Sequence, residues 1–173
     1  GAGNDIFTLV DGYVGSMMLG SGNDTVSVYG GMAETINLGS GNDKYVQNGG
    51  IVSALSVTSG TNTFSVTNGT VSSFDGSKGA NTFNIDGGDV TIVNGKVTNI
   101  TGGSGAESVS LNGGTITKAN LGAGEDNFTL NEGYVGSITT GENIDNIEVN
   151  GGIAETISFG SGNDIYVQNG GTV

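Results

Sequence analysis

The chain contains no cysteine, proline, histidine or tryptophan in its 173 residues. Without thiolates and imidazoles, it has no Cys or His side chain to ligate a metal or cofactor, or to act in catalysis. Positive charge is also scarce, with 4 Lys and Arg against 17 Asp and Glu and a formal net charge of −13. Nucleic acids and anionic membranes attract proteins through Lys and Arg, so we exclude both as partners and expect a cation instead.

Glycine, by contrast, is abundant, with 35 residues, and many of these lie in a five-residue box of the form G-x-G-N-D. The last residues of the successive boxes are Asp5, Asp24, Asp43, Asn62, Asn81, Glu107, Asp126, Asp145 and Asp164. Every step is 19 residues except the step of 26 from Asn81 to Glu107. A fixed period of this length predicts a solenoid in which each repeat is one coil.

Within each repeat, two apolar segments alternate with two turns. Residues two and four after the box are apolar with a period of two, as in Phe7 and Leu9, which predicts a strand. A turn glycine such as Gly12 stands seven residues after the box, and a second apolar pair such as Val14 and Met17 follows it. We therefore predict an all-β, right-handed parallel β-helix or β-roll solenoid of about nine 19-residue coils with two strands per coil.

The longer step places a 7-residue insertion near residues 88–101. There the sequence Gly88-Asp89-Val90 is echoed by Gly95-Lys96-Val97. We expect this insertion to form an extra segment on one side of its coil and to leave the boxes in register along one edge.

A second, longer repeat lies above the first. Residues 1–52 match residues 122–173 at an offset of 121, for example in G-Y-V-G-S at positions 12–16 and 133–137. We treat residues 1–173 as a single β-solenoid segment, and expect it to be a fragment of a longer protein with tandem repeats of about 121 residues. No run of the roughly 18 apolar residues that a membrane span needs is present, and no signal peptide opens the chain.

The boxes carry the chemistry. Boxes 20–24, 39–43 and 160–164 read G-S-G-N-D. Stacking places successive carboxylates about 5 Å apart, which is repulsive unless a cation lies between them. Ca²⁺ prefers oxygen ligands such as Asp carboxylates and the carbonyls of glycine turns.

These boxes resemble the G-G-x-G-x-D-x-U-x repeats of RTX proteins, most closely the 19-residue coils of large bacterial RTX adhesins. The resemblance implies Ca²⁺ bound between stacked turns. Here the leading Gly is replaced by Leu19, Leu38 or Phe159, and the second turn carries no matching Asp, so calcium is expected on one edge only. The candidate ligands are Asp5, Asp24, Asp43, Asp126, Asp145 and Asp164, with Gly3, Gly22, Gly41, Gly124, Gly162 and Glu107 as weaker candidates.

The middle of the rod is expected to hold less metal. Asn62 and Asn81 lack the carboxylate, and stacked amides can hydrogen-bond along the axis without a cation. Glu107 is a marginal member of the set. The same G-N-D sequence also suits turns that bind no metal.

Three classes of function remain. The first is a structural, non-enzymatic segment of a secreted bacterial surface, adhesive-fibre or surface-layer protein, extracellular and able to self-associate into a filament through coil ends or lateral contacts, with a cell-surface or polysaccharide target. The second is a β-helix domain or calcium-binding accessory module of a carbohydrate-active enzyme. The third is an ice- or ligand-binding adhesin face, although Lys78 and Glu142 interrupt the Ser column that such a face would use.

Four of the tyrosines and one pair of glutamates occur at repeated positions. Tyr45 and Tyr166 fall in the predicted core column, whereas Tyr13 and Tyr134 follow a turn glycine and are candidates for surface contacts. Glu34 and Glu155 repeat at the 121-residue offset, which indicates duplication rather than function.

Overall fold

The chain winds into a parallel β-solenoid of about 8 turns with a coil period of about 19 residues, as expected. The computed structural model describes residues 1–76 and 79–173, so the expectation for Lys78 lies outside the described residues. Nine boxes are separated by eight intervals, which reconciles the nine predicted coils with this number of turns. The described residues include no helix.

In the described part of the chain, fourteen strands form one continuous sheet. They are β1 (Ile6–Leu9), β2 (Tyr13–Met18), β3 (Thr25–Val28), β4 (Met32–Ser40), β5 (Lys44–Ile85), β6 (Asp89–Gly102), β7 (Ser108–Leu111), β8 (Thr115–Ala123), β9 (Asn127–Leu130), β10 (Tyr134–Glu142), β11 (Asn146–Val149), β12 (Ile153–Ala154), β13 (Ile157–Ser158) and β14 (Ile165–Gln168).

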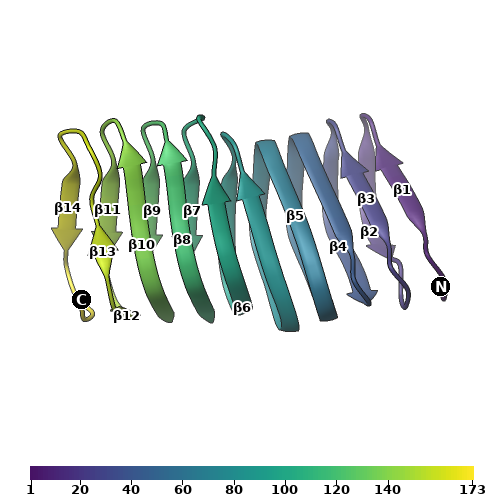
Figure 1. The fold of residues 1–173 in the computed structure, drawn as a ribbon. Coiled ribbons are helices and arrows are strands. Elements are labelled where there is room, and N and C mark those ends of the chain that lie inside the picture. Colours follow the sequence, from purple (N-terminus) through teal and green to yellow (C-terminus); the bar gives the residue numbers. More distant parts are fainter.

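The strands stack in two layers that face each other across a thin core. One layer, the front layer, contains β1 and β3 and continues through β8 and β10; the rear layer contains β2 and β4 and continues through β7, β9 and β11 (Figure 1). All pairs are parallel, and β1 pairs with β3 as Phe7 with Val26, one coil apart. Each strand therefore pairs with the strand at the equivalent position in the next coil, as in other solenoids.

The core consists of the apolar residues that the period of two predicts. Val26, Tyr45, Phe64 and Phe83 form one buried column, and Phe64 stacks on Phe83 with ring centroids 4.6 Å apart. Ala33, Ile36, Val52 and Leu55 line the opposite layer. Burying each such side chain contributes about 1.5–3 kcal/mol, so the rod is held together coil by coil.

The seven extra residues do not leave the boxes in register, and that expectation was wrong. Register along one edge would pair Thr82 with Ser108, since each directly follows its box. Instead, Thr82 pairs with Asn99, and Ser108 pairs with Asp89. The amide of Ser108 also donates to the carbonyl of Gly88, a turn glycine of the preceding coil.

The boxes therefore change from one edge of the rod to the other. We call the edge formed by boxes 1–5, 20–24, 39–43 and 58–62 the first edge. It continues with narrow turns at Gly95, Gly114 and Gly133. The second edge begins with turns at Gly12, Gly31 and Gly50 and continues with the boxes of Glu107, Asp126, Asp145 and Asp164.

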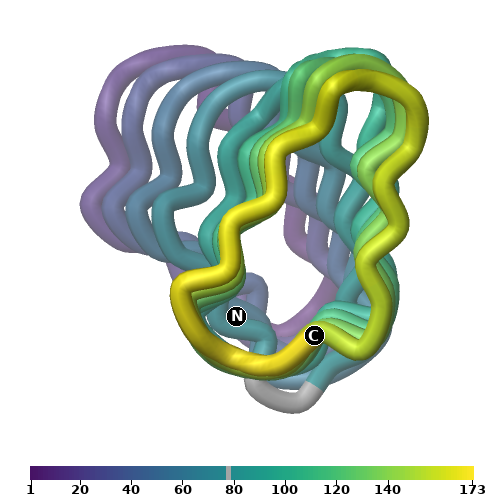
Figure 2. Tube along the Cα trace, turned by 90° about the vertical axis from the view of Figure 1, so that its left-hand side faces the viewer, coloured from purple at the N-terminus to yellow at the C-terminus, as the bar shows by residue number. Residues whose placement is uncertain are grey.

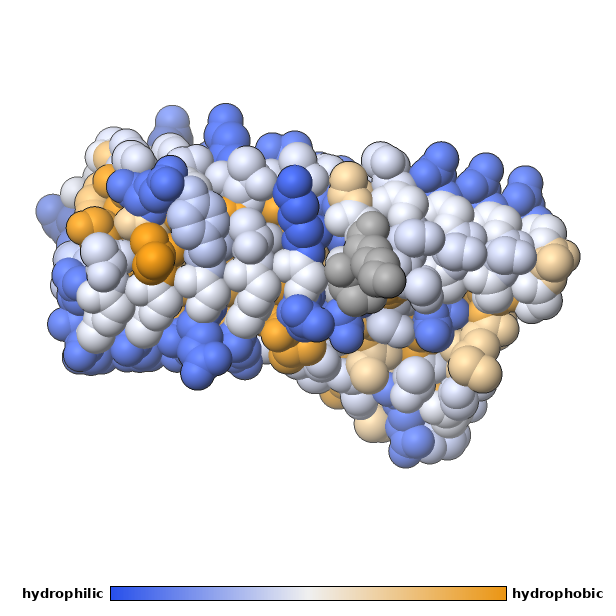
Figure 3. Space-filling view, turned by 90° about the horizontal axis from the view of Figure 1, so that it is seen from below, coloured by the Kyte–Doolittle hydropathy of each residue, from blue (hydrophilic) through white to orange (hydrophobic). Residues whose placement is uncertain are grey.

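The reason lies in the length of the insertion. Seven residues separate each box from its turn glycine, as between Asp5 and Gly12, so an insertion of that length moves the box onto the position of the turn. Viewed along the axis, the outlines of the purple to blue and the green to yellow coils differ accordingly (Figure 2). Viewed from below, the outline also changes near the middle of the rod (Figure 3).

Candidate cation-binding ladders

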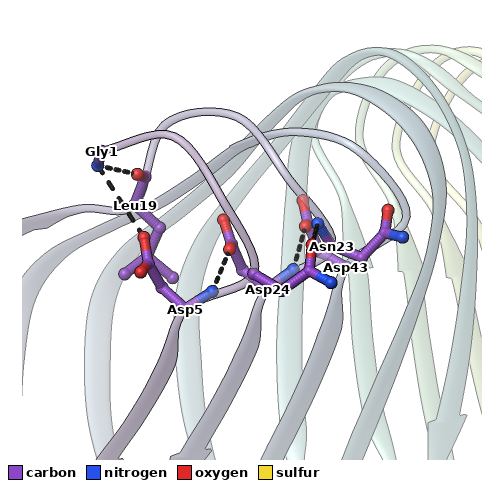
Figure 4. A network of polar contacts seen from close by, with 7 residues as sticks. Gly1, Asp5, Leu19, Asn23, Asp24 and Asp43 are labelled. Atoms are coloured by element: carbon purple, nitrogen blue, oxygen red, sulfur yellow. Dashed lines mark hydrogen bonds and ion pairs between the residues drawn. The ribbon is translucent and has the colours of Figure 1, made fainter.

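The box aspartates of the first three coils form a hydrogen-bonded ladder on the first edge. The backbone amide of Asp5 donates to Oδ1 of Asp24 at 2.8 Å, and the amide of Asp24 donates to Oδ1 of Asp43 at 2.9 Å (Figure 4). The amide of Asp43 donates in turn to Oδ1 of Asn62 at 2.9 Å. Each side chain thus secures the backbone of the coil before it.

The same arrangement recurs on the second edge with different residues. The amide of Glu107 donates to Oδ1 of Asp126 at 2.8 Å, that of Asp126 to Oδ1 of Asp145 at 3.0 Å, and that of Asp145 to Oδ1 of Asp164 at 3.0 Å. The six predicted aspartate ligands therefore form two sets of three on opposite edges. The expectation that all six aspartates lie on one edge was therefore wrong.

These carboxylates are buried and only half satisfied. Asp24, Asp43, Asp126, Asp145 and Glu107 are each at most 3% exposed. Of the seven buried side-chain atoms without a hydrogen-bond partner in the described part of the chain, five are the second oxygens of these carboxylates. A buried, unpaired charged oxygen costs several kcal/mol, so each of these atoms needs a proton or a cation.

Burial changes the acidity of the ladders. Loss of solvation raises the pKa of Asp43 and Asp126, opposed in part by the amide hydrogen bonds that they accept. Loss of solvation and the neighbouring charge of Asp126 raise the pKa of Glu107 to about 8. Two adjacent carboxylates about 5 Å apart repel each other by about 3 kcal/mol at an effective dielectric of 20, which favours neutralisation of the column.

Glycine is needed in the boxes because the stacked turns almost touch. Gly22 and Gly41 have φ of 136° and 139°, a left-handed region that residues with a Cβ rarely adopt. A Cβ on Gly41 would collide with the carbonyl oxygen of Gly22, and a Cβ on Gly22 with that of Gly3. Close stacking of the backbone keeps the carbonyl groups of successive turns beside the carboxylates; Gly124 and Gly162 occupy the same places on the second edge.

The outermost aspartates are more exposed than those inside each ladder. Asp5 has a half-exposed side chain, 45% exposed, that lies 3.8 Å from the N-terminal amine. Asp164 is also partly exposed. Among the six aspartates, the interior members Asp24, Asp43, Asp126 and Asp145 are therefore the strongest candidates for holding an ion, because each combines burial with an unpartnered oxygen, as Glu107 also does at the start of the second ladder.

The Asn residues at the middle of the rod pair with each other and close the first ladder. Asn62 donates from Nδ2 to Oδ1 of Asn81 at 3.1 Å, and Asn81 donates from Nδ2 to the carbonyl of Lys96 at 2.8 Å. Above Asn81 the next coil presents a carbonyl oxygen, which an amide satisfies and a carboxylate cannot. Asn81 thus closes the first ladder. The expected Asn pairing is confirmed, although its reason was not foreseen.

The second ladder starts with two acidic caps. Oε1 of Glu107 accepts from the amide of Gly87 at 2.8 Å. Gly87 lies in a narrow turn, and the longer side chain of Glu reaches it. Oδ1 of Asp86 accepts from the amides of Ser104 and Gly105 at 2.9 and 3.0 Å and so caps the first wide turn on the second edge. The single signal in the sequence was that Glu replaces Asp directly after the longer step.

The oxygen-only donor set of the ladders suits Ca²⁺. The buried, unpartnered carboxylate oxygens belong to Asp24 and Asp43 on the first edge and to Glu107, Asp126 and Asp145 on the second. No group of three or more Asp and Glu side chains that could hold a metal is found among residues 1–76 and 79–173. An ion on either edge would therefore lie between coils and share two ladder carboxylates with backbone carbonyls.

The expected division of the tyrosines into core and surface residues holds only in part. Tyr45 is fully buried, which raises the pKa of its phenol, and its hydroxyl donates to Gln47 Oε1 at 2.8 Å. Tyr166 is 39% exposed in the last coil. Tyr13 is exposed, and the neighbouring carboxylate of Glu34 raises the pKa of its phenol; Glu155 has the same effect on the pKa of Tyr134.

The comparisons with known proteins identify no relative: no protein family, no curated protein and no solved structure matches this chain significantly. Over the described residues no pocket is detected. The same residues include no helix that is long and apolar enough to cross a membrane.

Proposed function

We propose that the chain is a structural, non-enzymatic segment of a secreted bacterial surface or adhesive fibre, or of a surface-layer protein, and that Ca²⁺ bound between stacked boxes folds and stiffens it. The observation that carries this proposal is the pair of buried carboxylate ladders, in which Asp24, Asp43, Asp126 and Asp145 each keep one unpartnered oxygen. The bacterial, extracellular setting rests on the resemblance of the boxes to RTX repeats.

The ladders support calcium-dependent folding. In a chain of charge −13, the carboxylates repel one another in the folded state, and a bound divalent ion supplies the missing positive charge. Asp24 and Asp43 would hold it on the first edge, and Asp126 and Asp145 on the second. Because these pairs form only when coils stack, ion binding favours the folded state. The chain would remain unfolded at low cytosolic calcium and fold outside the cell.

The test is circular dichroism of the chain titrated with CaCl₂, with MgCl₂ in parallel and EDTA for reversal. We expect a gain of β signal and of melting temperature that is specific to calcium. The double variant Asp24→Asn with Asp43→Asn should lose the part of this gain that the first edge provides.

The matched control is Asp11→Asn with Asp89→Asn, which changes charge by the same amount at exposed positions. Asp11 accepts from the amide of Gly12 at 2.7 Å, as Asn68 does from Gly69 at 2.8 Å, so Asn fits there. The control should respond to calcium like the parent chain. If the parent chain is fully β in EDTA and its melting temperature ignores calcium, the boxes are turns only and the proposal fails.

A further inference from the structure

We infer that the longer step between Asn81 and Glu107 is a half-turn switch: it rotates the repeating pattern by half a turn about the rod axis, so that residues 122–173 present on one side of the rod what residues 1–52 present on the other. In a chain that continues the 121-residue repeat, successive units would then show the same surface on alternating sides. This inference concerns the register of the coils and does not depend on calcium.

Two pairs of repeated residues show the rotation. Tyr45 bonds Gln47 at 2.8 Å, and at the 121-residue offset Tyr166 bonds Gln168 at 3.0 Å. The first pair lies in the front layer, in the part of β5 that pairs with β3. The second lies in β14, which pairs with β11 in the rear layer. The same local structure thus occurs on opposite faces.

The surface follows the same rule. Tyr13 and Glu34 lie on β2 and β4 in the rear layer, where Tyr13 pairs with Met32. Their counterparts Tyr134 and Glu155 belong to the chain around β10, in the front layer that continues β8. A residue exposed on one side of the rod in one 121-residue repeat is therefore exposed on the opposite side in the next repeat. Six coils at about 4.8 Å per coil set an axial spacing of about 30 Å.

The sequence of the switch is adapted to the change of edge. Asn81 closes the first ladder on the carbonyl of Lys96, and Glu107 opens the second on the amide of Gly87. Between them Phe64, Phe74 and Phe83 fill the core, with Phe74 packed edge-on against both of the other rings at 4.9 Å. Asn81 thus presents a neutral amide, not a carboxylate, to the carbonyl of Lys96, and a close-packed aromatic cluster fills the core where the two opposed ladders meet.

The register is tested by cysteine pairs in this cysteine-free chain. Thr82, Asn99 and Ser108 all lie next to buried residues on outward-facing positions, so their replacement leaves the core intact. The variant Thr82→Cys with Asn99→Cys joins stacked neighbours at a distance that a disulfide spans, and should cross-link on mild oxidation. The variant Thr82→Cys with Ser108→Cys should not. Thr25→Cys with Lys44→Cys is the positive control, since those residues pair well away from the switch.

A deletion makes the test reciprocal. Removing residues 89–95 joins Gly88 to Lys96 and restores the 19-residue step, so that Thr82 and Ser108 become neighbours. In the deletion variant the Thr82/Ser108 pair should cross-link and the Thr82/Asn99 pair should not. The inference is overturned if the undeleted chain cross-links Thr82 to Ser108, or if it fails to cross-link Thr82 to Asn99 while the control pair forms. Both readouts are taken in EDTA and in calcium, so a failure of calcium binding is scored separately.

Discussion

At the scale of the residue, the two oxygens of a ladder carboxylate have different roles. One oxygen of Asp43 holds the amide of Asp24, and the other has no partner. The first contact needs only an acceptor, which Asn also provides, whereas the second oxygen is useful only with a proton or a cation. Substitution by Asn should therefore separate the two roles.

Asp43→Asn should raise the melting temperature in EDTA and reduce the rise that calcium produces. Asn keeps the acceptor for Asp24, removes a buried charge and can donate to Oδ1 of Asn62, as Asn62 does to Asn81. We expect about 1–2 kcal/mol of stabilisation without calcium, the usual scale for relieving an unsatisfied buried group. Thermal melts with and without CaCl₂ measure it. Destabilisation in EDTA would contradict this account, and Asp11→Asn controls for net charge.

Glu107 makes the stability of the metal-free rod depend on pH. Its pKa rises from the ordinary value of 4.5 to about 8 on folding, so the folded state binds protons more tightly than the unfolded state. Its contribution to stability is complete below about pH 4.5 and is lost as the pH rises through about 8. The slope reaches about 1.4 kcal/mol per pH unit for one proton.

Urea unfolding in EDTA across this range should therefore show stability falling with rising pH. Glu107→Gln should flatten the profile, because Gln keeps an acceptor for the amide of Gly87 but does not titrate. A profile that rises with pH, or an unchanged slope in the variant, would contradict the assignment.

At the scale of the element, the box turn is limited by contact between neighbouring coils. Gly41 has φ of 139°, and its Cα faces the carbonyl oxygen of Gly22. Ladder geometry, with about one coil every 4.8 Å, depends on this contact. A side chain at Gly41 would push the two turns apart and increase the distance between their carboxylates.

Gly41→Ala should destabilise the rod by at least about 1–3 kcal/mol from the backbone conformation alone, with the collision added. It should also weaken the calcium response. Gly15→Ala is the matched control, because a Cβ at Gly15 meets only the Tyr13 side chain at 3.7 Å and no unusual φ is required. Chemical denaturation of both variants gives the comparison, and equal losses would show that the contact between turns is unimportant.

At the scale of the whole molecule, the rod is a charged solenoid with repulsion distributed along two edges. Screening by monovalent salt should stabilise it in EDTA, since the Debye length falls from about 30 Å at ~0.01 M to about 10 Å at ~0.1 M. The melting temperature should rise with KCl over this range. Calcium at far lower concentration should give a larger rise, because the proposed sites are buried oxygens, whereas KCl only screens exposed charge. If KCl and CaCl₂ act alike at equal ionic strength, the ladders do not hold the ion.

The periodicity of the sequence is enough to predict the coil, its parallel stacking and its core. The 19-residue period leaves little choice of fold, and alternation around residues such as Val26 and Phe64 assigns the buried face. It also identified the box acids, because identical positions in successive coils must stack. All of this follows from periodicity, which is a local property of the chain.

The position of the boxes after the longer step, by contrast, depends on contacts between coils. An insertion of seven residues can bulge out of one coil or advance the pattern to the opposite edge, and the sequence is the same in both cases. The outcome depends on which pairing buries Phe74 and Phe83 together and satisfies Asn81 and Glu107, and these contacts join residues from different coils. The burial of the ladder oxygens likewise appears only when coils stack, since no single repeat encloses its own carboxylate.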